Sequence, residues 1–223
     1  MKNKSLVIVG DSAFAQVAYE YFTHDSDYTV VAFSVEKKYR TTDEMMGLPV
    51  VDFEEIEKKY DPASHAIYVA VVYTELNRLR TRLVAAAKEK GYSLASYISS
   101  RAFVWQNVKV GEHCFIFEDN TVQPFSEIGD NVVLWSGNHI GHHSKVGDHC
   151  FVSSHVVISG FAEIGQRSFL GVNSTISNNV VIGEDCWIGP GLLILKDTEP
   201  GKLFKGVAGE PAKVSALRFF RVQ

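Results

Sequence analysis

Residues 140–165 read IGHHSKVGDHCFVSSHVVISGFAEIG, and an aliphatic residue stands at every sixth position of this stretch. The same spacing continues in both directions without one interruption, from Ile98 to Ile194. Every isoleucine beyond Ile67 falls on the series, so chance does not explain it. The aliphatic positions are Ile98, Val104, Val110, Ile116, Val122, Ile128, Leu134, Ile140, Val146, Val152, Ile158, Ile164, Leu170, Ile176, Ile182, Ile188 and Ile194.

A six-residue period is too short for a strand, a turn and a reversal, but it suits one flat face of a triangular coil. Three faces make one coil, and successive coils stack at roughly 4.8 Å while each face buries one aliphatic ladder. Glycine follows the aliphatic residue once per coil, which predicts a recurring corner that requires a conformation open to glycine. These glycines are Gly111, Gly129, Gly147, Gly165 and Gly183. The pattern resembles the hexapeptide repeats of the left-handed parallel β-helix, which we expect over residues 98–199.

The first 97 residues have a different pattern, in which short β-branched runs alternate with helical periods. The expected strands are 5–9, 29–35, 48–51, 67–73 and 93–98, and the expected helices are 14–22, 52–60 and 74–90. This order predicts an α/β, Rossmann-like domain over residues 1–97, whose ligands bind at the carboxyl ends of the strands. Residues 200–223 form a C-terminal tail.

The first strand-to-helix turn of this domain reads Gly10-Asp11-Ser12. It lacks the second and third glycines of a dinucleotide-binding turn, and an acidic residue for a ribose comes one step late, at Glu36. NAD binding is therefore disfavoured. Backbone N–H groups at the helix start can still hold a phosphate or a sugar, while an ordinary capped turn explains the same residues equally well.

The composition suits a folded cytoplasmic protein. The 223 residues are 46% hydrophobic, and 22 Lys and Arg against 26 Asp and Glu give a net charge of −4. Without a basic excess, nucleic acid is disfavoured as a partner. No apolar stretch approaches the roughly 20 residues of a membrane span, so we expect no membrane insertion.

The three cysteines and most histidines fall on the repeat. Cys114, Cys150 and Cys186 occupy one small corner slot two coils apart, too far for a disulfide, which predicts inert packing groups. His113 and His149 share one outward slot, and they are expected on a solvated or inter-subunit surface. The same is expected of His139 and His155.

His142 has a distinctive position in the repeat. The residue 18 positions later is Gly160, so no side chain from the next coil blocks access to the imidazole. A histidine beside a free backbone N–H is what acyl transfer requires, because it supplies a general base and an oxyanion donor.

The segment His142-His143-Ser144-Lys145-Val146-Gly147-Asp148, followed by Ser159-Gly160, resembles the sialic acid O-acetyltransferase-like sugar acyltransferases. Their relatives N-acetylate nucleotide-linked 4-aminosugars for bacterial surface glycans, and share the two-part layout of this chain. The tail Gly206-Val207-Ala208-Gly209-Glu210-Pro211-Ala212-Lys213 is similar to their Gly-x-Pro-Ala-Lys ending. In this family an acidic residue usually follows the catalytic histidine, whereas this chain has His143, so the group that orients His142 is expected to come from elsewhere.

The resemblance implies an acetyl-CoA-dependent N-acetyltransferase with direct transfer and no metal. It implies that His142 is the base, that the Gly160 amide is the oxyanion donor, and that a homotrimer binds acetyl-CoA between its subunits. The nucleotide sugar would bind at Gly10, Asp11 and Ser12. Acetyl-CoA would bind at Gly160, Asn178, Lys196 and Lys205, with Lys202 and Lys213 as further candidates for its phosphates; a solvated basic tail explains the lysines equally well.

Three alternatives remain at this point. The first is a sugar O-acetyltransferase acting on a sialic acid or a polysaccharide precursor. The second is a metal-dependent hydrolyase or carbonic anhydrase-like enzyme using His139, His142 and His143, which is disfavoured because adjacent residues of an extended segment point to opposite sides. The third is a non-catalytic β-helix binding module.

Overall fold

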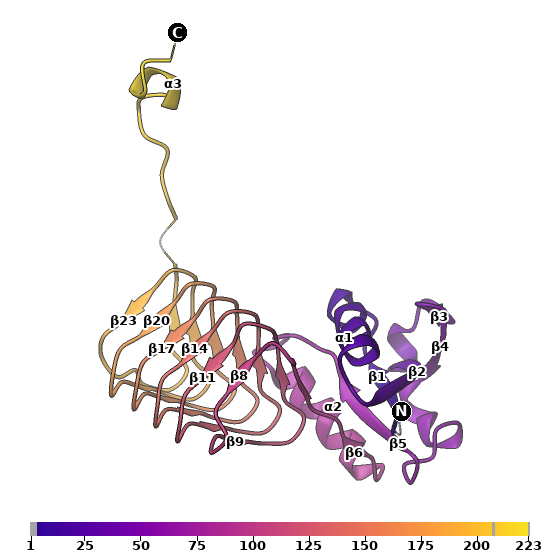
Figure 1. The fold of residues 1–223 in the computed structure, drawn as a ribbon. Coiled ribbons are helices and arrows are strands. Elements are labelled where there is room, and N and C mark those ends of the chain that lie inside the picture. Colours follow the sequence, from indigo (N-terminus) through magenta and orange to yellow (C-terminus); the bar gives the residue numbers. More distant parts are fainter. Residues whose placement is uncertain (1–3, 207, 223) are drawn as a thin grey trace.

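The computed structural model describes residues 4–206 and 208–222. Figure 1 shows a small α/β body beside a long stack of coils, and a C-terminal segment that rises away from the end of the stack. The described part of the chain contains no helix that is long and apolar enough to cross a membrane. Met1 to Asn3, Val207 and Gln223 lie outside the described residues, so the predicted tail motif is described except for Val207.

The N-terminal body is built on a six-stranded sheet in the order β3-β4-β2-β1-β5-β6. All its pairs are parallel except β3 with β4, so the sheet is mixed at one edge. Its strands are β1 (Lys4–Val9), β2 (Tyr28–Val35), β3 (Glu44–Met45), β4 (Leu48–Asp52), β5 (His65–Val69) and β6 (Ser93–Leu94). Its helices are α1 (Ala13–His24), α2 (Arg78–Glu89) and the short 3-10 helices η1 (Lys37–Tyr39) and η2 (Phe53–Lys58).

Two expected helices differ in the structure. The segment 52–60 forms the 3-10 helix η2 because Glu55 leaves helical geometry, with φ −120° and ψ 17°. The helix expected over 74–90 begins only at Arg78, since the three residues before it take left-handed backbone, which cannot continue a right-handed helix. These residues are Glu75, Leu76 and Asn77, with φ of 54°, 51° and 66°.

The repeat region is a parallel β-prism with three faces, as the six-residue period predicts. The first face holds β7 (Tyr97–Ile98), β10 (Phe115–Ile116), β13 (Val133–Leu134), β16 (Phe151–Val152), β19 (Phe169–Leu170), β22 (Trp187–Ile188) and β24 (Leu203–Phe204). The second face holds β8 (Phe103–Val104), β11 (Thr121–Val122), β14 (His139–Ile140), β17 (Val157–Ile158), β20 (Thr175–Ile176) and β23 (Leu193–Ile194). The third face holds β9 (Lys109–Val110), β12 (Glu127–Ile128), β15 (Lys145–Val146), β18 (Glu163–Ile164) and β21 (Val181–Ile182).

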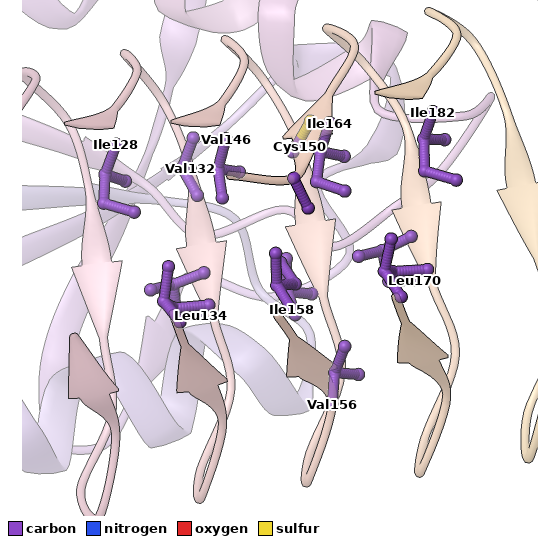
Figure 2. Close-up of a cluster of buried hydrophobic side chains, with 14 of the residues drawn as sticks. Ile128, Val132, Leu134, Val146, Cys150, Val156, Ile158, Ile164, Leu170 and Ile182 are labelled. Atoms are coloured by element: carbon purple, nitrogen blue, oxygen red, sulfur yellow. The ribbon is translucent and has the colours of Figure 1, made fainter. Parts of the chain in front are cut away.

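The second residue of nearly every strand points inward and forms the core of the prism (Figure 2). Each pair in register joins equivalent residues of successive coils, as in Ile140 with Ile158. Burying one such aliphatic side chain contributes roughly 1.5–3 kcal/mol. The prism is therefore held together by three continuous aliphatic ladders.

The recurring glycines have a different cause from the one expected. The left-handed residue of a typical corner lies two positions after the glycine, as at His149 with φ 64°, and it is usually not glycine. A Cβ on Gly147 would lie 2.8 Å from the backbone nitrogen of Gln166, and one on Gly129 would lie 2.9 Å from that of Asp148. Glycine recurs because the next coil passes directly over its Cα.

The N-terminal body covers the first face of the prism. The outward residues of this face are mostly aromatic, and three of them, Phe115, Phe151 and Phe169, are buried in one cluster with residues of the N-terminal sheet and α1. Phe14 of α1 packs edge-on against Phe115, with ring centroids 5.6 Å apart. This aromatic ladder fixes the first face as an interior surface.

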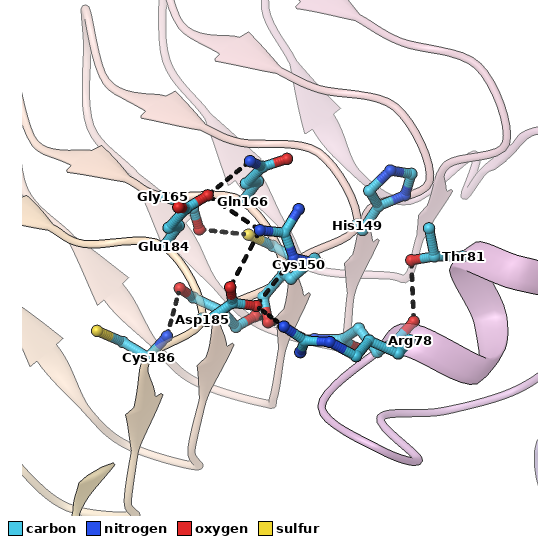
Figure 3. Close-up of polar contacts among 12 residues, drawn as sticks. Arg78, Thr81, His149, Cys150, Gly165, Gln166, Glu184, Asp185 and Cys186 are labelled. Atoms are coloured by element: carbon cyan, nitrogen blue, oxygen red, sulfur yellow. Dashed lines mark hydrogen bonds and ion pairs between the residues drawn. The ribbon is translucent and has the colours of Figure 1, made fainter. Parts of the chain in front are cut away.

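Buried polar contacts fix the two bodies against each other. Arg80 of α2 is fully buried, and its guanidinium donates to the carbonyls of Val72 (2.8 Å), His149 (3.0 Å) and Cys150 (3.1 Å). Two residues earlier in sequence, Arg78 forms an ion pair of 2.9 Å with Asp185 of the prism (Figure 3). A buried arginine with satisfied donors sets one docking geometry.

The C-terminal tail carries the short helix α3 (Ala216–Phe219). Its apolar side chains are exposed, with Phe219 at 68% and Phe220 at 73%.

Candidate functional site

The candidate site lies at the corners that connect the second face to the third. Equivalent residues of successive coils form a column there: Gln106, Pro124, His142, Gly160, Asn178 and Lys196. Backbone hydrogen bonds link neighbouring corners. The Phe161 N–H donates to the His142 carbonyl (3.0 Å), and the Asn179 N–H donates to the Gly160 carbonyl (3.1 Å). Four of the predicted site residues, His142, Gly160, Asn178 and Lys196, are thus stacked along one edge of the prism.

The imidazole of His142 lies directly against Gly160. A Cβ on Gly160 would lie 2.9 Å from Cε1 of His142 and 3.0 Å from Nε2. No side chain longer than a hydrogen fits there without moving the ring. The His142 side chain is exposed. The backbone N–H of His142 donates to Oε1 of Gln123 (3.0 Å), and this hydrogen bond holds the His142 backbone in place.

The Gly160 amide lies on the same notch. Its nitrogen would be 2.5 Å from a Cβ on Gly141, so it sits directly above the residue that precedes His142. Among the hydrogen bonds of residues 4–206 and 208–222, none uses the Gly160 N–H as a donor. A free N–H beside an exposed imidazole is an arrangement that supports acyl transfer.

The expectation that His142 and His143 point to opposite sides is wrong. The pair stands at a corner, where His143 has φ 59°, and not in an extended segment. Their Nδ1 atoms are 3.2 Å apart, with the rings nearly perpendicular at 86°. His143 is stacked between Phe125, with centroids 4.7 Å apart, and Phe161, at 4.8 Å. The sequence contained the signal for this stack, since the three residues are 18 apart.

The expected N-terminal binding site is a cavity of about 650 Å³ at the carboxyl ends of β1, β2 and β5. Gly10 and Asp11 line it, and Gly10 adopts φ 127° with its N–H donating to the Ser34 carbonyl (2.8 Å). Ser12 is the N-cap of α1, and it is not among the described residues that line the cavity.

The same cavity contains charged side chains that the turn motif did not identify. Arg82 donates two hydrogen bonds to Glu36, at 3.0 and 2.9 Å, and Lys38 lines the wall nearby. The Arg82 guanidinium lowers the pKa of Glu36 below its usual range, mainly through these hydrogen bonds. Arg82 comes from α2, so only the fold brings it to the end of β2.

The predicted lysines lie in three places. Lys196 and Lys205 line a groove of about 610 Å³ at the C-terminal end of the prism, together with exposed Leu193, Leu195 and Leu203. Lys202 forms an exposed ion pair of 2.9 Å with Glu199. Lys213 is exposed on the tail.

Within one chain, the two candidate binding regions are not brought together. The His142 corner joins the second and third faces, so it lies on the edge opposite the first face. The N-terminal body covers that first face.

His113 is not on a solvated surface, and His149 is only partly exposed. His113 is 1% exposed, and it is locked between the two bodies because its Nε2 accepts the Val69 N–H (2.8 Å) and its Nδ1 bonds to Oδ1 of Asn131 (2.9 Å). Burial lowers the pKa of His113 to about 3. It also lowers the pKa of His149, which is half-buried against Asn131.

The three cysteines are free and buried, in one repeated slot. Cys114 Sγ contacts the Gly129 carbonyl (3.1 Å), and Cys150 Sγ makes the same contact with Gly165 (3.2 Å). Burial raises the pKa of both thiols to about 12. Such thiols are protonated at neutral pH, as expected of packing groups.

No cluster of three or more His, Cys, Asp or Glu residues that could hold a metal occurs in the described ranges 4–206 and 208–222. This includes the neighbourhood of His142 and His143.

Two family models match the repeat region. Residues 125–160 match the bacterial transferase hexapeptide (six repeats), and residues 162–196 match the hexapeptide repeat of succinyl-transferase. No curated protein sequence gives a significant match to the chain.

Solved structures match nearly the whole chain. The acetyltransferase domain of PglB from Neisseria gonorrhoeae is 23% identical, with a TM-score of 0.82 over 94% of this chain and 100% of that one. PerB from Caulobacter crescentus, solved in complex with CoA and GDP-perosamine, is 26% identical, with a TM-score of 0.80 over 91% and 94% of the two chains. Two variants of the Caulobacter perosamine N-acetyltransferase, with one histidine changed to Asn or Ala, also match at 26% identity and TM-scores of 0.81. The similarity to sugar acetyltransferases expected from the sequence is confirmed. The repeats match hexapeptide transferase models, and together with the structural matches they indicate an acyltransferase.

Proposed function

We propose that this protein is an acetyl-CoA-dependent N-acetyltransferase that acts on a nucleotide-linked amino sugar, with a 4-amino-4,6-dideoxy sugar as the favoured acceptor. The observation that carries the proposal is the contact between His142 and Gly160, which leaves an exposed imidazole beside a free amide. The matched Caulobacter enzyme is an N-acetyltransferase that was solved with CoA and GDP-perosamine, which supports this substrate class. The proposed role is in bacterial surface glycan synthesis.

In the proposed reaction, the amine nitrogen of the sugar attacks the thioester carbonyl of acetyl-CoA. His142 Nε2 takes a proton from the attacking nitrogen, and the Gly160 N–H donates to the oxyanion. Collapse of the tetrahedral intermediate breaks the C–S bond, and the sulfur leaves with the proton that His142 returns. The products are an amide and CoA, and no enzyme residue becomes acylated.

Acetyl-CoA fits the edge above His142. Asn178 and Lys196 follow Gly160 along the column, and three strand spacings of roughly 4.8 Å place Lys196 about 14 Å from the His142 corner. The groove at Lys196 and Lys205 combines exposed leucines with two cations, which suits an apolar arm that ends in phosphates. These residues would hold the cosubstrate, with its thioester toward Gly160.

The nucleotide sugar fits the N-terminal cavity. We infer that residues 1–97 form a Rossmann-like domain that binds the nucleotide, that residues 98–199 form the transfer domain and that residues 200–223 form a tail. Gly10, Asp11 and Ser12 mark the start of α1, where backbone N–H groups favour phosphate. Lys38 adds a cation to the wall of this cavity.

We also propose a homotrimer. The His142 edge and the N-terminal cavity lie on different sides of one chain, so the sugar must reach His142 of a neighbouring subunit. A closed ring of three chains would provide three equivalent sites of this kind. We expect this assembly in the cytoplasm, where acetyl-CoA and nucleotide sugars are available.

The test is incubation of the purified protein with acetyl-CoA and UDP-, dTDP- or GDP-linked 4-amino sugars, followed by CoA release and product mass. Acetylation of one of these amines supports the proposal. No turnover on any of them, with turnover on free sugars or hydroxyl acceptors, would replace it with a sugar O-acetyltransferase. Failure to bind CoA at all would favour a binding module.

A further inference from the structure

We propose that His143 positions His142 for catalysis by accepting a hydrogen bond from its Nδ1, so that two imidazoles form the dyad. This inference rests on the proposed function for its kinetic consequence, but its structural content is independent of the substrate. It replaces the expectation that the group that orients His142 comes from elsewhere. The carrying observation is the 3.2 Å distance between the two Nδ1 atoms.

The hydrogen bond fixes the tautomer of both rings. To act as a base through Nε2, neutral His142 must carry its proton on Nδ1. That N–H then points to Nδ1 of His143, which can accept only when His143 is neutral and carries its own proton on Nε2. One bond thus selects the reactive form of His142 and leaves its Nε2 lone pair beside Gly160, 3.0 Å from the position of the missing Cβ.

The structure holds His143 rigidly in this role. Its ring is sandwiched between Phe125 and Phe161, at interplanar angles of 27° and 17°. Phe161 also contacts the His142 ring edge-on at 5.1 Å. The three stacked residues share the left-handed conformation, with φ of 65°, 59° and 59°. Stacking on both faces fixes the plane of the His143 ring, and the hydrogen bond to His142 selects the orientation that turns Nδ1 toward it, as a positioning residue requires.

Among the residues around His142, His143 is the one that can accept the hydrogen bond from the His142 Nδ1–H. Pro124 and Phe125 lie on the coil below the pair, and Gly160 and Phe161 on the coil above, and none of these titrates. Gln123 contacts the pair only through its carbonyl oxygen and the His142 N–H. The nearest charged side chain along the chain, Lys145, is paired with Glu163 at 3.2 Å. Among the described contacts of His142, none is with a carboxylate.

The dyad predicts its own inactivation by acid. One added proton leaves an Nε2–H on both rings and a single proton between the two Nδ1 atoms, so His142 loses the Nε2 lone pair that acts as the base. A carboxylate at position 143 would instead stabilise protonated His142 and keep it charged to higher pH.

Three substitutions test the proposal. H143F keeps a ring in the stack but has no acceptor, H143Q keeps a neutral acceptor, and H143E supplies an anionic one. The fold tolerates phenylalanine here, because Phe125 and Phe161 occupy the same position in the adjacent coils with the same backbone conformation. Equal melting temperatures of H143F and the wild type check this.

Two readouts are compared for all variants. The first is the 15N NMR tautomer signature of His142 in the full-length protein without substrate. Wild type and H143Q should show Nδ1–H, and H143F should lose this preference. The second is the pH profile of kcat and of the KM for acetyl-CoA. H143F should lower kcat about 10–100-fold with KM unchanged, H143Q should restore it to within a few fold, and the acid limb of H143E should move to higher pH.

The NMR and kinetic readouts distinguish failure of the His142–His143 dyad from failure of the proposed function. An unchanged His142 tautomer in H143F would overturn the dyad, and so would equal kcat values for H143F and wild type. If wild type acetylates no nucleotide-linked amine, the proposed function fails, while the NMR result still decides whether His143 positions His142.

Discussion

The imidazole of His142 occupies the space that a side chain on Gly160 would fill, because a Cβ there would lie 2.9 Å from Cε1 of His142. The contact joins two residues that are 18 apart in sequence and one coil apart in space. Gly160 therefore leaves open the space that the His142 ring occupies.

The first prediction concerns Gly160→Ala. The added methyl group must displace the His142 ring, and we expect kcat to fall by about 10–100-fold, since small displacements of catalytic groups have effects of this size. Gly209→Ala is the matched control, because a Cβ at Gly209 meets nothing within 4 Å. Unchanged kcat in Gly160→Ala would show that the notch is not the reaction centre.

The second prediction concerns sharing of the site between subunits. His142→Asn and Asp11→Trp, which fills the N-terminal cavity with an indole, should each be inactive alone. If the two candidate halves come from different chains of a trimer, about a quarter of all sites should be intact after random coexpression, and about one site in three in the isolated mixed trimers. Mixed oligomers are isolated with two different affinity tags. Absence of any activity in them would mean that both halves act within one chain.

Much of this architecture could be predicted from the sequence. The six-residue ladder from Ile98 to Ile194 specified the prism strand by strand, and the 18-residue spacing placed Gly160 over His142. The spacing did not show which way the individual side chains point. From the spacing, His142 and His143 were expected to be neighbours in an extended segment. They stand at a corner instead, where His143 takes the left-handed conformation. The spacing likewise assigned the His113 ring to the surface.

The docking of the N-terminal body explains the error at His113. The sequence feature that marks the first face as the covered one is its row of outward aromatic residues, such as Phe115 and Phe151. Arg80 and Arg82 both lie on α2, yet one is buried against the prism and the other lines the cavity. Such long-range contacts are set by packing between bodies, which local periodicity does not encode.

The third prediction is a pH dependence of stability caused by His113. Its pKa is lowered to about 3 in the folded protein from an ordinary value of 6.5, so the unfolded chain binds the proton first. The stability that neutral His113 contributes is therefore complete above pH 6.5 and is lost as the pH falls toward 3. This one group should lower the free energy of unfolding by about 1.4 kcal/mol per pH unit in that window.

Urea unfolding at several pH values measures this effect. His113→Asn should show a shallower pH slope than the wild type, because asparagine does not titrate and tolerates left-handed backbone. His155→Asn is the control, since His155 has the same φ of 58° and an exposed ring. Identical slopes for wild type and His113→Asn would refute the assignment.

The fourth prediction concerns the cysteines. Because all three are buried and burial raises the pKa of Cys114 and Cys150 to about 12, an aromatic disulfide reagent should label none of them in the folded protein within minutes. All three should react once the chain is unfolded in denaturant. Rapid labelling of the folded protein with loss of activity would contradict a packing role.

The central claim is that His142 is the general base of direct acetyl transfer, and one kinetic comparison tests it most directly. His142→Asn should lower kcat by about 10²–10⁴-fold on the acceptor amine that the wild type acetylates, while the affinity for CoA measured by calorimetry stays within a few fold. A His142→Asn enzyme with kcat within a few fold of wild type would contradict the account.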